Sequence, residues 1–121
     1  MIVVKVAKFV FFLQSFLFLF CLFLVLPQIV PFDFGEESIN ELDMVSASCT
    51  VNKGDLPIDV AWTKNGGRLY TSDGIVVTKT SQRMSVLSIE SVRARHAGNY
   101  SCVATNNGGV TKQWAILAVN G

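Results

Sequence analysis

The chain has 121 residues, which is enough for one domain of common size. Half of its residues are hydrophobic, yet seven of the nine phenylalanines fall between Phe9 and Phe23, so the positive mean hydropathy describes the N-terminus and not the remainder. From Gln28 onward, eight lysines and arginines stand against nine acidic residues, and no basic run occurs. This near-neutral balance argues against nucleic-acid binding, and we expect protein partners instead.

Residues 1–26 have the order of parts found in a secretory signal peptide. A short basic region with two lysines precedes the apolar run from Phe9 to Leu26, which only two polar residues interrupt. No pair of small residues near its end marks a cleavage site, and about eighteen apolar residues is also the lower limit for spanning a bilayer. A cleaved signal peptide and an uncleaved signal anchor therefore both stay open. In either case residues 27–121 should face outward, which predicts an extracellular domain.

After the leader, apolar residues alternate with polar ones along short stretches, and turn-forming residues separate these stretches. Pro27 and Pro31 suit an extended first strand at a sheet edge. The residues expected on the buried faces are, in chain order, Val45, Ala47, Cys49 and Val51; Ile58, Val60 and Trp62; Leu87, Ile89 and Val92; Tyr100, Cys102 and Ala104; and Ala115, Leu117 and Val119. Short strands with one buried face predict an all-β, antiparallel two-sheet sandwich.

The cysteines indicate a covalent link within this sandwich. Cys21 lies inside the apolar leader, which leaves Cys49 and Cys102 as a pair in the exported part. An even pair in an exported chain predicts a disulfide. Its loop of roughly fifty residues would stabilise the fold by about 4 kcal/mol on a chain-entropy argument.

Two aromatic residues complete a known constellation around these cysteines. Trp62 follows Cys49 by thirteen positions, and Tyr100 precedes Cys102 by two. In an immunoglobulin-type sandwich the cysteines bridge the facing sheets, the tryptophan packs on the bridge, and the tyrosine hydroxyl bonds to the backbone just upstream. Sheets about 10 Å apart leave room for one disulfide and one large flat side chain. We therefore expect these four residues, with Leu87 and Ile89, to form the core.

The chain resembles an immunoglobulin domain of the intermediate (I-set) kind, because the segment "GGRLYTSDG" (66–74) is too short for the two extra strands of the variable type. More narrowly, it resembles the Down syndrome cell adhesion molecule (Dscam) family. The matching blocks are "LPQIVPFDFGEE" (26–37), "KGDLPIDVAWTKNG" (53–66), "VLSIESVRARHAGNYSCVATNNGG" (86–109) and the closing "LAVNG". Here the domain directly follows the leader, as in shortened invertebrate members, whereas in the long forms it lies inside a tandem array.

The resemblance implies an extracellular recognition module for cell adhesion, used in neuronal recognition. Its partner would be an identical copy on an opposing cell, bound face to face through one sheet. The alternative is a secreted heterophilic or immune-type recognition domain. No nucleophile–base pair, carboxylate dyad or phosphate loop can be recognised, so we expect no enzyme, no cofactor and no metal. Membrane contact is expected only through the N-terminal segment or a missing C-terminal anchor.

Two polar residues near Cys102 are further candidates. His96 is the chain's one histidine, and the segment offers it neither a catalytic relay nor enough ligands for a metal. We expect a surface residue at the corner before the cysteine, without the aspartate–arginine salt bridge that many immunoglobulin domains have there. Asn99-Tyr100-Ser101 is an N-glycosylation acceptor. Asn99 points outward if Tyr100 points inward, and whether it carries a glycan stays open.

Exposed apolar residues are the candidates for partner contact. Met44 and Val86 are expected to face outward on one sheet, with Val76 as a third candidate there, and Trp114 and Ile116 should face outward on the other sheet. Single exposed hydrophobic residues are common, whereas a cluster suits an interface. By the resemblance, the sheet of Met44, Val76 and Val86 is favoured for self-pairing.

Overall fold

The computed structural model describes residues 23–35 and 38–121. All but the last four residues of the predicted leader, 1–26, lie outside these ranges, so its cleavage or retention stays a prediction. Within the described ranges, no helix has both the length and the apolar character needed to cross a membrane.

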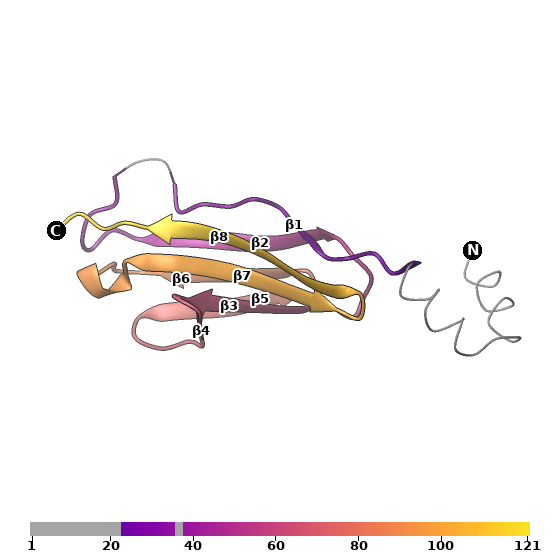
Figure 1. Cartoon of the computed structure of the whole chain (residues 1–121). Coiled ribbons are helices and arrows are strands. Elements are labelled where there is room, and N and C mark those ends of the chain that lie inside the picture. Colours follow the sequence, from indigo (N-terminus) through magenta and orange to yellow (C-terminus); the bar gives the residue numbers. More distant parts are fainter. Residues whose placement is uncertain (1–22, 36–37) are drawn as a thin grey trace, which may run out of the picture.

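The described residues form eight strands in two sheets that pack face to face (Figure 1). One sheet has the order β1 (Gln28–Ile29), β2 (Val45–Lys53), β6 (Met84–Ile89) and β5 (Ile75–Ser81). The other has the order β4 (Gly67–Arg68), β3 (Asp59–Lys64), β7 (Gly98–Asn106) and β8 (Gly109–Leu117). Neighbouring strands in both sheets are antiparallel, and one short 3-10 helix, η1 (Ala94–His96), precedes β7. The predicted all-β two-sheet sandwich is confirmed.

The core lies between the sheets, where the alternating apolar residues meet. In β2 and β6 every second side chain is buried, and Leu87 and Ile89 have no exposed surface. Full burial of one such side chain contributes about 1.5–3 kcal/mol. Val60 and Val119, which were also expected to face inward, are only partly buried because they pack against the margin of the core.

The segment between β1 and β2 adds two aromatic rings to the core. Phe32 meets Trp62 edge to face with ring centroids 5.2 Å apart, and Phe34 meets Tyr100 in the same way at 5.3 Å. Edge-to-face pairs of this kind are worth about 0.5–1.5 kcal/mol beyond their buried area. The two phenylalanines outside the leader therefore each cover one aromatic residue of the predicted core.

Contacts between separate segments of the chain stabilise each end of the sandwich. At one end, the Asn106 side-chain amide donates to the carbonyl oxygens of Val25 (2.7 Å) and Asp55 (3.0 Å), which joins the β7–β8 turn to the β2–β3 loop. At the other end, Asn40 and Asn120 form a parallel bridge. The first described residues and the C-terminus thus lie at opposite ends of the molecule (Figure 1).

Candidate functional site

The predicted disulfide joins Cys49 on β2 to Cys102 on β7, with Cα atoms 6.2 Å apart, and so links the two sheets. Trp62 is the cross-strand neighbour of Cys102, and its buried indole N–H donates to the Ser85 hydroxyl oxygen at 3.1 Å. This bond satisfies two polar groups inside the core. The role of Ser85 could not be predicted from the sequence, because alternation places the residue inward but does not reveal which polar group it meets. These residues are buried and stabilise the fold, so any contact with a partner must be made by surface residues.

His96 is not the surface residue that the sequence analysis predicted, since only 1 % of it is exposed. Its Nδ1 lies 2.9 Å from the backbone nitrogen of Arg93, and its Nε2 lies 2.8 Å from the carbonyl oxygen of Asp73. A backbone N–H only donates, so Nδ1 accepts, and the proton of the neutral ring lies on Nε2 and is donated to Asp73. The predicted surface position was wrong because the sequence around His96 does not show that two backbone groups bind its ring nitrogens.

An ion pair is present at this corner, although residue 96 does not take part in it. Arg95 Nε lies 3.0 Å from Asp73 Oδ1. Both side chains are more than half exposed, and exposed pairs contribute about 0–1 kcal/mol. The hydrogen bond from the His96 ring to the Asp73 carbonyl oxygen therefore holds the β4–β5 connection to η1 more strongly than the ion pair does.

Tyr100 completes the corner. Its hydroxyl donates to the carbonyl oxygen of His96 at 2.5 Å, which is the bond to upstream backbone that the sequence predicts. Burial, with a smaller contribution from the negative charge of Asp73, raises the pKa of the Tyr100 hydroxyl to about 12. The hydroxyl therefore stays protonated at physiological pH and remains a donor.

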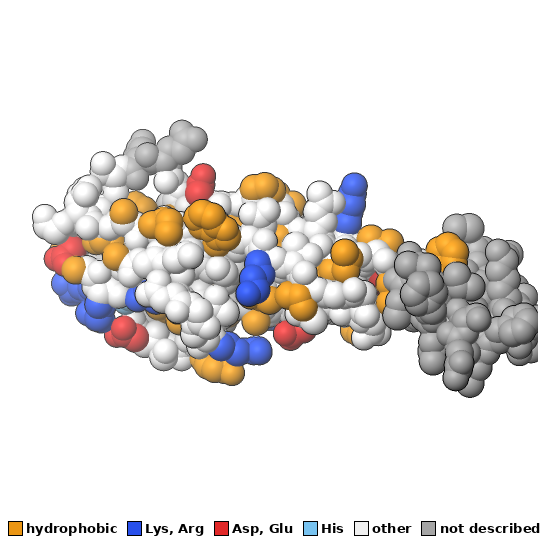
Figure 2. All heavy atoms as spheres, viewed as in Figure 1, with side chains coloured by type: hydrophobic (Ala, Val, Ile, Leu, Met, Phe, Trp, Pro, Cys, Tyr) orange, Lys and Arg blue, Asp and Glu red, His pale blue; other side chains and the backbone are white. Residues whose placement is uncertain are grey.

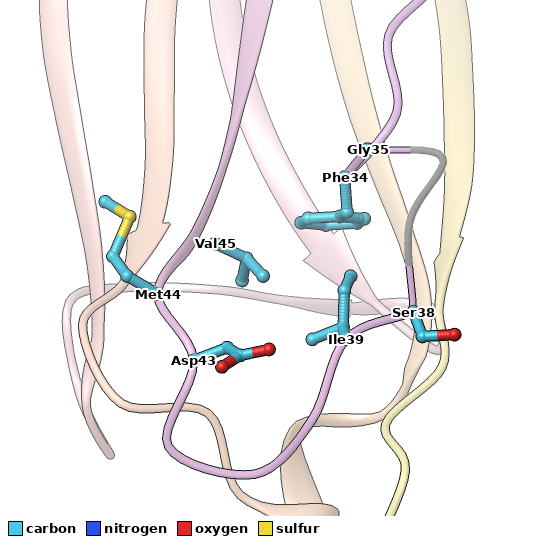
Figure 3. A pocket seen from close by; sticks show the side chains of 7 residues that line it. All are labelled: Phe34, Gly35, Ser38, Ile39, Asp43, Met44 and Val45. Atoms are coloured by element: carbon cyan, nitrogen blue, oxygen red, sulfur yellow. The ribbon is translucent and has the colours of Figure 1, made fainter.

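The described residues offer little to a metal or a small ligand. No group of three or more His, Cys, Asp or Glu side chains lies close enough among them to hold a metal ion. A hollow of about 410 Å³ lies beside the start of β2 and is lined by Phe34, Gly35, Ser38, Ile39, Asp43, Met44 and Val45. Figure 3 shows Phe34, Ile39 and Val45 pointing toward one another, while Met44 points away. The Asp43 carboxylate already accepts a hydrogen bond from the Asn40 backbone at 2.8 Å.

The middle strands of the first sheet and its edge strand β5 present an outer face, called face 1 below, whose side chains are uncharged and mostly small. Its members on β2, β6 and β5 are Ser46, Ser48, Thr50, Met84, Val86, Ser88, Val76 and Thr78. Val86 lies between Ser48 and Thr78, and Ser88 lies between Ser46 and Val76, so the two valines are diagonal neighbours. Such neighbours have Cα atoms about 7–8 Å apart. Met44 precedes β2 and lies beyond the Ser46–Ser88 row, so the structure groups Val76 with Val86 but not with Met44.

The outer face of the second sheet, called face 2, has larger apolar side chains. Figure 2 looks onto this sheet and shows exposed hydrophobic side chains along it. On β8, Val110, Trp114 and Ile116 expose 57 %, 62 % and 58 % of their surface. Ile116 lies opposite Asn99, and Trp114 lies opposite Ser101. The structure therefore places the predicted glycosylation acceptor, Asn99, beside Trp114 and Ile116 and not beside Val110.

These features define a class of protein. The two sheets, the disulfide between β2 and β7, the tryptophan beside it and the tyrosine corner are those of an immunoglobulin-like sandwich, and the single two-residue strand β4 between β3 and β5 fits the I-set kind. The sequence model of the family described as "Immunoglobulin domain" matches residues 27–106. The chain belongs to the immunoglobulin domain family.

Within that family, the chain is similar to the Dscam proteins. It is 40 % identical over 98 residues to the cell adhesion molecule Dscam1 of Drosophila melanogaster, which covers 80 % of the chain and 5 % of that relative. It is 39 % identical over 80 residues to human cell adhesion molecule DSCAML1, which covers 66 % of the chain and 4 % of that relative. The crystal structure of the Dscam1 Ig7 domain, isoform 9, superposes with a TM-score of 0.75 at 40 % identity, covering 78 % of this chain and all of that one. The resemblance stated from the sequence is confirmed.

Proposed function

We propose that residues 27–121 form an extracellular adhesion module that pairs with an identical copy through face 1. The observation that carries the proposal is the absence of charge from the eight described side chains of this face, five of which are serine or threonine. The similarity to cell adhesion molecules supports the class of function.

The chemistry of face 1 suits contact with itself. In a two-fold symmetric pair the same patch supplies both sides, so a charged residue near the axis would meet its own copy. Face 1 avoids this repulsion, and its small side chains let the two sheets approach closely. Val86 on β6 and Val76 on the edge strand β5 supply diagonal apolar contacts. Face 2 instead includes Asp59 and Lys112 among its outward residues.

The size of face 1 predicts a weak contact. Three strands spaced about 4.8 Å apart, which together carry the eight outward residues of face 1, offer only a few hundred Å². A stable interface buries about 800 Å² on each partner. One pair of domains should therefore associate transiently, and many copies on a surface would be needed for firm adhesion.

The disulfide supports the extracellular placement. Bonds of this kind form and persist in oxidising compartments and are rare in the cytosol. The apolar run at residues 9–26 supplies the signal that export requires, either as a cleaved signal peptide or as an anchor. The sandwich would then lie on the outer side of the membrane.

A bead aggregation assay with the full chain tests this proposal. We expect wild-type beads to aggregate and Val86→Lys beads not to, because the two introduced charges face each other across the contact. Mixing Val86→Lys with Val86→Glu beads should restore aggregation through opposite charges. Val110→Lys, which places the same charge on face 2, is the matched control and should aggregate like the wild type.

Two results would contradict the proposal. Loss of aggregation in Val110→Lys but not in Val86→Lys would assign pairing to face 2. If wild-type beads stay dispersed yet bind cells, the partner is a different protein and the secreted heterophilic alternative gains support.

A further inference from the structure

Asn99 has several of the properties that an N-glycosylated asparagine needs. Asn99-Tyr100-Ser101 is the only Asn-x-Ser/Thr triplet in the 121 residues. Tyr100 points into the core, so Asn99 and Ser101 point to the opposite side, and Asn99 is exposed. Its backbone N–H is bonded to the Asn65 side chain at 3.0 Å, but its own side-chain amide has no hydrogen-bond partner among the described residues. The amide nitrogen is therefore free to carry a sugar.

The register of β7 and β8 places this amide beside two large exposed apolar side chains of β8. Ile116 is directly opposite Asn99, and Trp114 is its diagonal neighbour, directly opposite Ser101. Opposite side chains on one face have Cβ atoms about 4.5–5.5 Å apart, and diagonal ones remain within reach of long or aromatic groups. A group attached to the Asn99 amide thus begins next to both residues.

We propose that Asn99 carries an N-linked glycan whose first sugar rings lie over Ile116 and Trp114. The side-chain amide nitrogen forms a bond to C1 of the sugar of a lipid-linked pyrophosphate oligosaccharide. The bond between C1 and the pyrophosphate oxygen breaks, the lipid pyrophosphate leaves, and the amide proton goes to the transferring enzyme's base. No oxidation or reduction takes place. The proposal rests on the extracellular placement argued above, because this transfer occurs during export.

The chemistry of a pyranose ring fits the surface beside Asn99. One face of the ring presents mainly C–H groups, which pack well on a flat indole, while the hydroxyl groups at its rim stay in water. Trp114 and Ile116 are more than half exposed, and two large apolar neighbours on an outer sheet face indicate that something covers them. A glycan there would also exclude a protein partner from face 2 and leave face 1 open.

The first part of the test is the mass of the full chain recovered from eukaryotic secretory cells. We expect glycosidase treatment to remove one glycan and to leave aspartate at position 99, marked by heavy oxygen when the reaction is run in labelled water. Ser101→Ala should abolish the mass difference, and the matched variant Ser101→Thr, which keeps the acceptor triplet, should retain it. An exported wild-type chain without this difference would overturn the proposal.

The second part asks where the sugar lies. The chain has two tryptophans, and Trp62 is buried, so fluorescence quenching by acrylamide reports mainly on Trp114. We expect quenching to rise when the glycan is removed by Ser101→Ala or by glycosidase on the native protein. In Trp114→Phe the difference should disappear. If removal of the glycan leaves quenching unchanged, the glycan does not cover Trp114, and the proposed position of the sugar rings is wrong.

The outcomes also separate this inference from the proposed function. Protease protection in membrane vesicles shows whether the chain reaches the exported side. A chain that is exported but not glycosylated contradicts the glycan and leaves the adhesion proposal standing. A chain that is not exported overturns both, and a glycosylated chain whose beads stay dispersed contradicts only self-pairing.

Discussion

At the scale of single residues, the corner before β7 is held by neutral groups. His96 contacts the backbone of Arg93 and of Asp73, and Tyr100 in turn donates to the backbone of His96. Three segments of chain are thereby joined with no buried charge. A buried hydrogen bond is costly to break on one side only, because the partner left behind loses both water and its bond.

Replacing His96 should therefore weaken the fold. We expect His96→Phe, which keeps a ring but removes both nitrogens, to lower the free energy of unfolding by about 2 kcal/mol, since the Arg93 N–H and the Asp73 carbonyl lose their partners. Urea denaturation of the disulfide-intact chain measures this. Arg95→Ala removes the exposed ion pair and should change stability by less than about 1 kcal/mol. Equal losses in both variants would mean that the buried bonds contribute no more than the salt bridge.

The raised pKa of Tyr100 predicts a loss of stability in alkali. Its folded pKa of about 12 lies above the ordinary value of 10.0, so the folded state holds the proton more tightly than the unfolded state. The stabilisation is complete below about pH 10 and is lost as pH rises from about 10 toward 12. Urea unfolding measured from pH 8 to pH 12 should therefore show a steeper decline for wild type than for Tyr100→Phe.

Spectroscopy provides an independent check of the Tyr100 pKa. The chain has two tyrosines, so Tyr70→Phe leaves Tyr100 as the sole phenol. Its ultraviolet absorbance should then show no ionisation at pH 10 while the chain is folded. Ionisation at that pH in a folded chain would contradict a buried, hydrogen-bonded hydroxyl.

Sequence reasoning worked at residues whose role is set by their own chemistry. Cys49, Trp62, Tyr100 and Cys102 could be placed because the space between two sheets selects those residue types at those positions. His96 could not, because its role depends on a carbonyl 23 residues away, and carbonyls are the same in every residue. The short alternation that marks a corner as exposed cannot distinguish a solvated histidine from one bonded to two backbone groups.

At the scale of elements, the β2–β3 loop depends on a close backbone approach. Gly54 has a φ of +129°, and a Cβ atom there would lie 2.8 Å from Pro27 Cα and 3.2 Å from Leu26 O. Both obstacles are backbone, so neither can rotate away. Only glycine lets the start of β1 pass this close to the loop.

We expect Gly54→Ala to destabilise the chain by roughly 1–3 kcal/mol, because strain in φ and the clash with Pro27 add together. A calorimetric Tm lower by several degrees would report it. The matched control is Gly67→Ala, whose Cβ would have only an ordinary contact with Lys64 O at 3.6 Å. If the two variants have the same Tm, the close contact between Pro27 and the β2–β3 loop does not limit stability.

Strand pairings were predictable to different degrees. The β7–β8 register follows from the tight turn, because Asn106 pairs with Gly109 and each earlier residue then has its partner fixed. The nearness of Asn99 to Ile116 was thus readable from the sequence once the turn was placed. No such turn joins β2 to β6, so the grouping of Val86 with Val76, and the separation of Met44 from both, required the structure.

At the scale of the whole molecule, the near-neutral domain and its uncharged face 1 predict how self-association responds to salt. Screening weakens contacts between charges and leaves apolar contacts largely intact. We expect wild-type bead aggregation to change little between about 0.05 M and 0.5 M salt. The mixed aggregation of Val86→Lys with Val86→Glu beads, which depends on introduced charges, should fall over the same range. A steep salt dependence of wild type would indicate charged contacts outside face 1.

The placement of the first described residues and the C-terminus has a mechanical consequence. Because the first described residues and the C-terminus lie at opposite ends of the sandwich, a pull between them runs along the strands and loads the Asn40–Asn120 bridge and the β1–β2 pairing in shear. Once these give way, the Cys49–Cys102 bond still locks a span of 53 residues against extension. Only the flanking residues can lengthen, by roughly 3.4 Å each. The disulfide would therefore set an upper limit on how far the domain can extend under force.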